Sequence, residues 1–167
     1  MLEPSVDLYG AAHKRVQEQL SALLDRSRAR YALVVDRKGF VLLHAAAVWA
    51  PAPPSLDSLA TLVASNHSAN AAIAKLFGDD GFREVVQQGS DVGTYVEELG
   101  PDALLLVVFD AHATLGKIKV HAARSAEEIR TELAALREAD VPDLNLDAAW
   151  SESTEKLLDG LFGPRDA

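Results

Sequence analysis

Apolar residues recur every three or four positions in three stretches of the chain, and this spacing predicts three helices. The first helix is expected from Tyr9 to Arg28. The second is expected to follow the capping residue Ser55 and to end at Gly78. The third begins after Thr114, another capping residue, and its apolar stripe is the most regular of the three: Leu115, Ile118, Ala122, Ala126, Ile129, Leu133 and Leu136.

Five short extended segments are expected between these helices. Residues 31–35 and 40–44 are predicted to form a hairpin, because the Asp-Arg-Lys-Gly sequence between them is typical of a turn. Residues 82–88, 92–99 and 103–109 follow, separated by Gly-Ser-Asp and Gly-Pro-Asp turns. The order of elements predicts an α+β fold, an αββαβββα sandwich in which helices flank one five-stranded antiparallel sheet.

The domain is expected to occupy residues 1–140. Residues 141–167 are predicted to form a polar linker and a short amphipathic tail helix, whose apolar side would consist of Leu157, Leu158, Leu161 and Phe162.

Composition excludes several classes of protein. The 167 residues carry a net charge of −9, which disfavours nucleic acid as a partner, because phosphates demand a basic surface. There is no cysteine, so neither disulfides nor thiolate metal sites are expected. The first ten residues lack the features of a signal peptide, and the apolar run at residues 103–109 is too short to span a bilayer. We therefore expect a cytoplasmic protein with no membrane span.

The motifs of enzymes are missing as well. The sequence has no Walker phosphate-binding loop and no serine nucleophile elbow, and its five histidines fall in no metal-binding spacing. We expect no catalytic residues, no metal and no cofactor.

The second helix is unusual because it carries no charged side chain between Asp57 and Lys75. With an advance of about 100° per residue, one side collects its large apolar residues and is predicted to face the core. That side consists of Leu59, Leu62, Val63, Ile73 and Phe77, with Asn66 and Asn70 in the same arc. The opposite side is small and almost uncharged, and it consists of Thr61, Ala64, Ser65, Ser68, Ala72 and Lys75.

A surface of that kind lets another molecule approach closely without a large desolvation cost. Two simpler interpretations remain open at this point: a helix buried on both sides, or an alanine-rich helix exposed to solvent.

Four segments carry a resemblance to the Roadblock / dynein light chain family, and within it to the bacterial MglB group, which regulates the Ras-like GTPase MglA. They are ALVVDRKGFVL in the hairpin, LATLVASNHSANAAIAKLFG in the second helix, QQGSDVGTYVEEL, and LLLVVFDAHATLGKIKVHAAR. The resemblance covers about residues 5–140, and the order of elements agrees throughout.

This resemblance implies a homodimer in which the second helices pair and the third strands join two sheets. Leu62, Asn66 and Val86 are the expected dimer contacts. The paired helices would then bind an MglA-type GTPase through Thr61, Ala64, Ser65, Ser68, Ala72 and Lys75.

The mechanism implied is GTPase activation without an arginine finger: the protein binds the GTP form and repositions the GTPase's own catalytic residues. Arg37 and Arg83 are the fingers that the sequence would offer. Some members of the MglB group also promote nucleotide exchange with the help of a C-terminal tail, and residues 157–162 are the segment that the resemblance implies for that part here. Two alternatives stay open, a dimeric Roadblock adaptor without effect on hydrolysis and a small-molecule sensor of PAS or GAF type.

A second partner surface is expected on the last helix. Lys117, His121 and Arg124 form a basic strip opposite its apolar stripe, although most such strips are only solvated.

Overall fold

The computed structural model describes residues 3–140, and the chain divides into two units, residues 1–137 and 138–167. The first unit is described from residue 3 onward. The predicted linker and tail helix lie outside the described residues. The helices are α1 (Gly10–Ser27), α2 (Leu56–Leu76) and α3 (Leu115–Asp140), and the strands are β1 (Tyr31–Asp36), β2 (Val41–Ala46), β3 (Glu84–Gln88), β4 (Gly93–Glu98) and β5 (Ala103–Phe109).

The element order and the α+β fold class predicted from the sequence are confirmed. The five strands form one sheet in the order β2-β1-β5-β4-β3, and every neighbouring pair is antiparallel. All residues of β1 and β5 are buried, as expected of central strands that are covered on both faces. The two edges of the sheet are β2 and β3.

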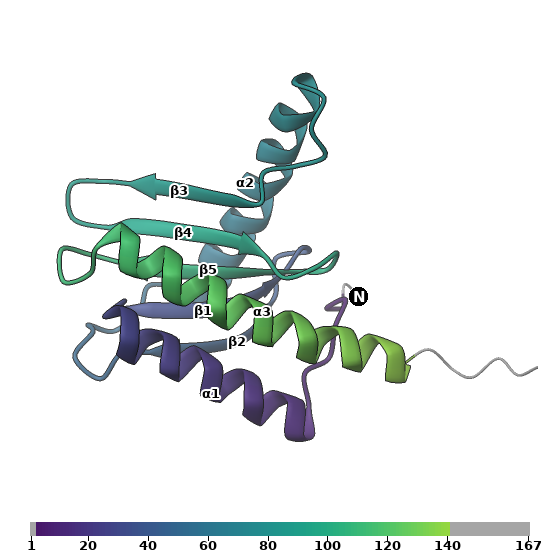
Figure 1. Cartoon of the computed structure of the whole chain (residues 1–167), viewed down its shortest axis with the longest axis horizontal. Helices are drawn as coiled ribbons and strands as arrows, with labels where there is room; N and C mark the ends of the chain where they lie inside the picture. Colours follow the sequence, from purple (N-terminus) through teal and green to yellow (C-terminus); the bar gives the residue numbers. More distant parts are fainter. Residues whose placement is uncertain (1–2, 141–167) are drawn as a thin grey trace, which may run out of the picture. The chain divides into compact units, whose positions relative to one another are not determined.

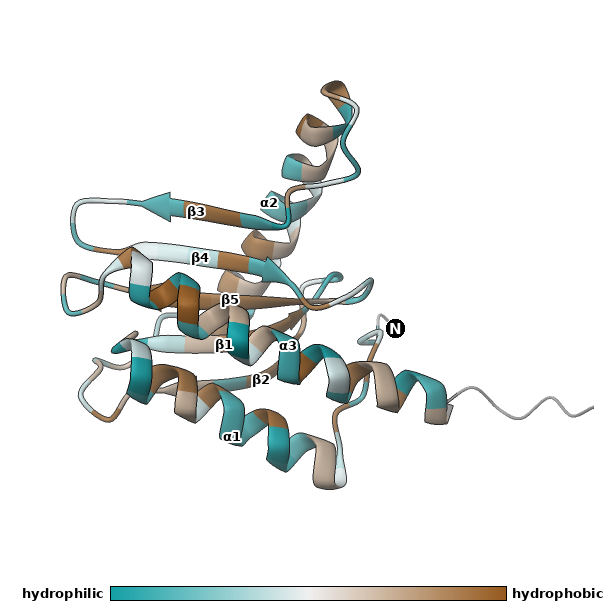
Figure 2. Cartoon of the chain, viewed as in Figure 1, coloured by the Kyte–Doolittle hydropathy of each residue, from teal (hydrophilic) through white to brown (hydrophobic). Residues whose placement is uncertain are grey.

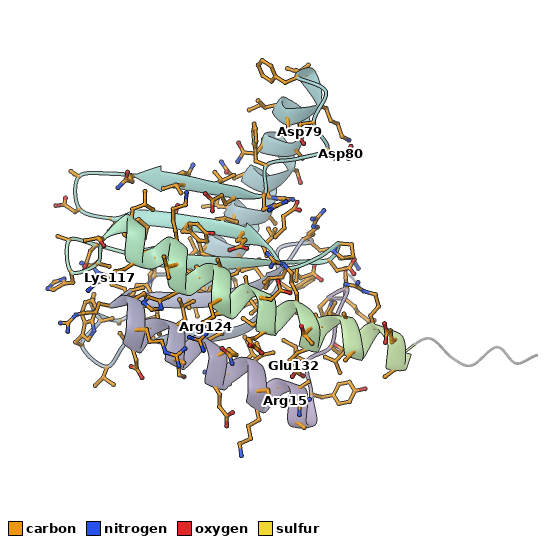
Figure 3. The ribbon with its side chains drawn as sticks, viewed as in Figure 1. Arg15, Asp79, Asp80, Lys117, Arg124 and Glu132 are labelled. Carbon is orange, nitrogen blue, oxygen red and sulfur yellow. The ribbon has the colours of Figure 1, made fainter. Side chains whose placement is uncertain are left out.

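The helices cover the two faces of the sheet unequally (Figure 1). Helices α1 and α3 lie side by side on one face, and their apolar stripes form the larger core with alternate residues of the strands. Arg15 of α1 and Glu132 of α3 join the two helices at 2.6 Å (Figure 3). Helix α2 lies alone on the opposite face and packs on a smaller cluster around Leu33, Val35 and Leu106.

Local signals set the ends of these helices. The Ser55 hydroxyl accepts a hydrogen bond from the Ser58 N–H at 3.3 Å, which is the predicted N-cap of α2. The Thr114 hydroxyl accepts one from the Lys117 N–H at 3.4 Å at the start of α3. No helix among residues 3–140 is long and apolar enough to cross a membrane.

Gly93 allows the sheet to pack against the Phe109 ring. A Cβ at Gly93 would lie 2.4 Å from Phe109 Cζ and 2.6 Å from Cε2, much closer than van der Waals contact. Phe109 is itself 4% exposed and belongs to the larger core, so a displaced ring would lose packing there.

We expect Gly93→Ala to lower the free energy of unfolding by about 1–3 kcal/mol, the usual cost of overpacking a core. Gly116→Ala is the matched control, because a Cβ added there would meet nothing within 4 Å beyond its chain neighbours and the backbone of its own helix. Urea unfolding of both variants provides the measurement. Equal stability of the two would contradict this packing.

Candidate functional site

Helix α2 presents three different faces. One face contains its buried residues, which are Ala60, Ala64, His67 and Ala74; it faces the sheet except near Ala74, where the segment that follows the helix folds back on it. A second face carries Leu62, Ile73 and Phe77. The third carries Thr61, Ser65, Ser68, Ala72 and Lys75, and we call these five residues the platform face.

The prediction that Leu62, Ile73 and Phe77 face the core is wrong. These side chains are 67%, 46% and 83% exposed. Small residues bring α2 close to the sheet, so the narrow alanine face is the one buried. Beyond it, the C-terminal part of α2 extends past β3, and the apolar end of the helix has no sheet beneath it (Figures 1 and 2).

A groove of about 240 Å³ separates the exposed apolar side of α2 from the uncovered part of the sheet. Asn70 Nδ2 donates a hydrogen bond to Asn66 Oδ1 at 2.7 Å on the same side, so the two amides partly satisfy each other. The groove is lined by Leu59, Leu62, Val63, Asn66, His67 and Asn70 of α2 and by Val85, Gln87, Thr94 and Val96 of β3 and β4.

All five residues of the platform face are exposed. The Thr61 hydroxyl donates to the Asp57 carbonyl at 2.9 Å, and the Ser68 hydroxyl donates to the Ala64 carbonyl at 3.1 Å. These two hydroxyl groups donate their protons within the helix, so they are not free to donate to a partner. Ala64, which the sequence placed with these residues, is 6% exposed and points toward the sheet, so it does not belong to the platform face.

A polar tether holds the middle of α2 to the neighbouring turns, and it consists of His67, Glu98 and Arg37. His67 Nε2 lies 3.2 Å from Glu98 Oε1, and Arg37 Nη2 donates to the same oxygen at 3.0 Å. Arg37 also donates to the Gly100 carbonyl at 3.2 Å. Burial lowers the pKa of His67, the charge of Arg37 lowers it further, and Glu98 opposes both.

Strand β3 has an unpaired edge in this chain. The Arg83 carbonyl accepts a hydrogen bond from the Glu98 N–H, and the Gly89 N–H donates to the Val92 carbonyl. In an antiparallel ladder every second residue of a strand bonds to the same neighbour, so residues 83, 85, 87 and 89 face β4. The backbone N–H and C=O of Val86 therefore point outward from the sheet. The Val86 side chain packs against the core beneath α3, so Val86 offers its backbone at this edge rather than its side chain.

The predicted basic strip lies on α3, on the other side of the sheet from α2. Lys117 and Arg124 are exposed, and Figure 3 shows both on this helix. His121 is half-buried. Within residues 3–140, none of the three forms a salt bridge, and their role as a partner surface stays a prediction.

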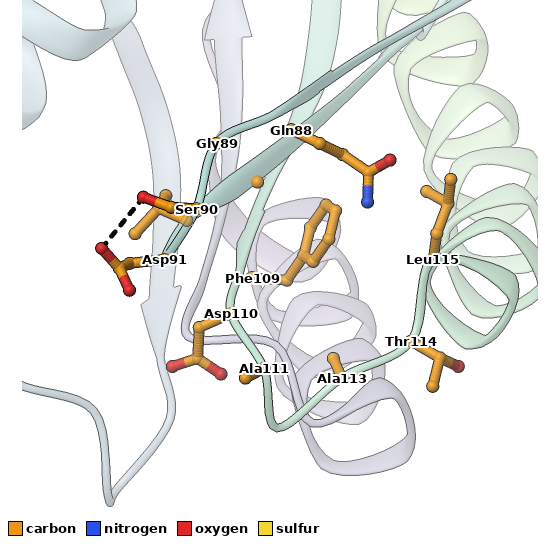
Figure 4. A pocket seen from close by; sticks show the side chains of 12 residues that line it. Gln88, Gly89, Ser90, Asp91, Phe109, Asp110, Ala111, Ala113, Thr114 and Leu115 are labelled. Atoms are coloured by element: carbon orange, nitrogen blue, oxygen red, sulfur yellow. Dashed lines mark hydrogen bonds between the residues drawn. The ribbon is translucent and has the colours of Figure 1, made fainter.

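Other cavities offer little for small-molecule chemistry. A pocket of about 270 Å³ lies between the β3–β4 turn and the loop before α3, with the Phe109 ring at its base (Figure 4). Of its two carboxylates, Asp110 is bonded to Arg30 and His112, and Asp91 accepts a hydrogen bond from the Ser90 hydroxyl. A larger hollow of about 600 Å³ beside α3 is lined by Glu84, Tyr95, Glu97 and Arg130, which bond to one another or to Lys119. Among residues 3–140, no three acidic or histidine side chains are grouped to hold a metal.

Comparison with known proteins settles the family. The family model for the Roadblock/LC7 domain matches residues 15–109, which is more than half of the chain. The chain belongs to the Roadblock/LC7 family.

Solved structures agree with this Roadblock/LC7 assignment. An MglB with a tetrameric arrangement is 52% identical, with a TM-score of 0.79 over 81% of this chain and 99% of that one. The gliding protein MglB from Thermus thermophilus is 51% identical, with a TM-score of 0.79 over 80% of this chain and 99% of that one. MglB from Myxococcus xanthus, at 23% identity and a TM-score of 0.70 over 78% and 96% of the two chains, shares the fold. No curated protein matches this sequence.

The resemblance to the Roadblock family and to MglB predicted from the sequence is therefore confirmed. What the sequence did not indicate is the tether, in which Arg37, His67 and Glu98 hold α2 to the neighbouring turns. His67 is one of several polar residues in an uncharged helix, and its burial depends on the sheet beneath it. No local pattern identifies such a contact.

The lowered pKa of His67 makes stability depend on pH. The unfolded chain binds a proton at His67 below about pH 6.5, whereas the folded chain resists it. The free energy of unfolding is therefore expected to fall as the pH is lowered through this range.

In His67→Gln, this part of the pH dependence should disappear. His44→Gln, at an exposed position of β2, should keep the wild-type slope. Urea unfolding between about pH 7.5 and pH 5 is the measurement. A His67→Gln variant with the full wild-type slope would show that the tether does not carry the effect.

Proposed function

We propose that this Roadblock/LC7 protein is an MglB-like regulator that, as a homodimer, binds a Ras-like small GTPase of the MglA type in its GTP form and stimulates hydrolysis. The observation that carries the proposal is the platform face: an exposed, small and nearly uncharged helix surface in a chain of net charge −9. Identity of 51–52% with two MglB structures supports the choice of partner class. Cytoplasmic localisation and a role in cell polarity or motility belong to the same proposal.

Two features that a single chain leaves exposed support dimerisation: the apolar face of α2 and the outward backbone of β3. Leu62, Ile73 and Phe77 are exposed on α2, Leu76 is 83% exposed, and the groove beside them is largely apolar. The outward backbone of Val86 offers hydrogen bonds to another strand. A second copy of the chain would cover the apolar face of α2 and also pair with the backbone of β3. Pairing along β3 would bring the α2 helix of the second copy toward the groove. Asn66 and Asn70 would then help to fix the register of the paired helices.

The mechanism proposed does not use an arginine from this chain. Arg37 is engaged by Glu98 and by the Gly100 carbonyl, so its guanidinium is committed within the domain. Arg83 is exposed beside β3 and lines the hollow on the α3 side of the sheet, away from the platform face. Stimulation would instead come from selective binding of the GTPase conformation whose own catalytic groups are assembled.

A dimeric Roadblock adaptor that binds without stimulating hydrolysis is the alternative, and it fits the same surfaces. A PAS-like or GAF-like sensor is less well supported, because the polar groups around the described hollows are bonded to one another. Promotion of nucleotide exchange by the tail at residues 157–162 concerns a segment outside the described residues.

A long cation on the platform face should prevent docking. Ser68→Arg with Ala72→Arg would bury unpaired charge, and a loss of about 3 kcal/mol weakens binding about a hundredfold. Single-turnover GTP hydrolysis by the GTPase, with saturating regulator, is the measurement. Ala123→Arg with Ala134→Arg, both exposed on α3, is the control of equal charge.

Full stimulation by a folded Ser68→Arg, Ala72→Arg protein would place the site elsewhere. Arg37→Ala should leave stimulation nearly unchanged, whereas a loss of about a thousandfold, the scale of an arginine finger, would overturn the mechanism. Binding without any stimulation by the wild type would favour the adaptor.

A further inference from the structure

The turn between β1 and β2 lies directly against the platform face. Gly39, at φ +93°, approaches α2 so closely that a Cβ would lie 3.0 Å from Thr61 Cα and 3.3 Å from Thr61 Oγ1. No side chain separates the turn from the helix at this point. A molecule that docks over Thr61 therefore meets the turn as well.

The turn is also held rigidly. The Asp36 carboxylate is buried and accepts the backbone N–H groups of Ser5 and Lys38. The Gly39 N–H donates to the Asp36 carbonyl at 2.9 Å, and the Arg37 N–H donates to the Asp102 carbonyl at 2.9 Å. With the Arg37–Glu98–His67 tether, these bonds attach the turn to the β4–β5 connection and to α2. A contact surface fixed in this way costs little ordering entropy on binding.

Of the three charged side chains in the turn, only Lys38 is both exposed and without an ion-pair partner among residues 3–140. Arg37 is paired with Glu98, and Asp36 is buried. Lys38 is exposed at the tip; its Nζ donates to the Glu3 carbonyl at 3.0 Å, and no carboxylate among residues 3–140 forms an ion pair with it. Lys38 is thus a cation on the turn that adjoins the nearly uncharged platform face.

We propose that the β1–β2 turn is a cationic rim of the platform face, and that Lys38 pairs with a carboxylate of the docked GTPase. The inference rests on the proposed function and adds a specificity-determining residue to it. Charges at the rim of an interface act mainly on the association rate and on its salt dependence. Lys38 therefore favours GTPases that present an acidic group opposite the turn.

The test compares association rates of the GTP-loaded GTPase with three variants of the full chain, by stopped-flow fluorescence at low and high salt. Lys38→Glu should slow association about tenfold at low salt, and the difference should shrink at about 1 M salt, where the Debye length is only about 3 Å. Lys38→Arg should associate like the wild type. Lys14→Glu makes the same change in net charge at an exposed position of α1, on the other side of the sheet, and should have a much smaller effect.

Equal slowing by Lys38→Glu and Lys14→Glu would overturn the proposal, because only overall charge would then matter. If Ser68→Arg with Ala72→Arg abolishes binding and Lys38→Glu changes nothing, the platform remains and the rim is refuted. If the wild-type protein does not bind the GTPase at all, the proposed function fails, and this inference fails with it. Circular dichroism of each variant shows that the fold is intact.

Discussion

The close packing of α2 on its sheet is the constraint on which the other surfaces depend. Alanines at positions 60 and 64 let the N-terminal half of the helix approach the sheet, and only a narrow strip of its circumference is buried. The helix has 21 residues and lies alone on its face of the sheet. Two further faces, one apolar and one small and nearly uncharged, are therefore left for other molecules.

Both remaining faces gain their geometry from the same contacts. The Arg37–Glu98–His67 tether and the Gly39–Thr61 contact fix α2 relative to the turns at one end of the sheet. The platform face is therefore held in one position before a partner binds. A rigid surface of this kind suits a regulator that selects one conformation of its partner. The homodimer proposed above would hold two such surfaces in a fixed relation.

The sequence was sufficient for the order of the elements, because each one has a strong local signal. The fully apolar β5, the capping residues Ser55 and Thr114 and the stripe of α3 are signals of this kind. It was not sufficient for the orientation of α2. Its largest apolar arc, with Leu62 and Phe77, was assigned to the core of the single chain, although α2 extends past the sheet edge and buries alanines instead.

Hydrophobic periodicity identifies an apolar face but not the molecule that covers it. For the same reason, Ala64 was grouped with the platform face from its angle alone. The small neutral face itself was visible in the sequence, because the absence of charge is a local property. The tether was not visible, since it joins residues far apart in the chain: Arg37, His67 and Glu98.

Covering of the apolar face of α2 by a second copy is the central claim, and the mass in solution tests it most directly. Light scattering at micromolar concentrations should give twice the 17.9 kDa of one chain. Leu62→Glu should shift the mass toward a single chain, whereas Val120→Glu on α3, at 68% exposure against 67% for Leu62, should not. A wild-type mass of one chain, or a Leu62→Glu variant as dimeric as Val120→Glu, would contradict the account.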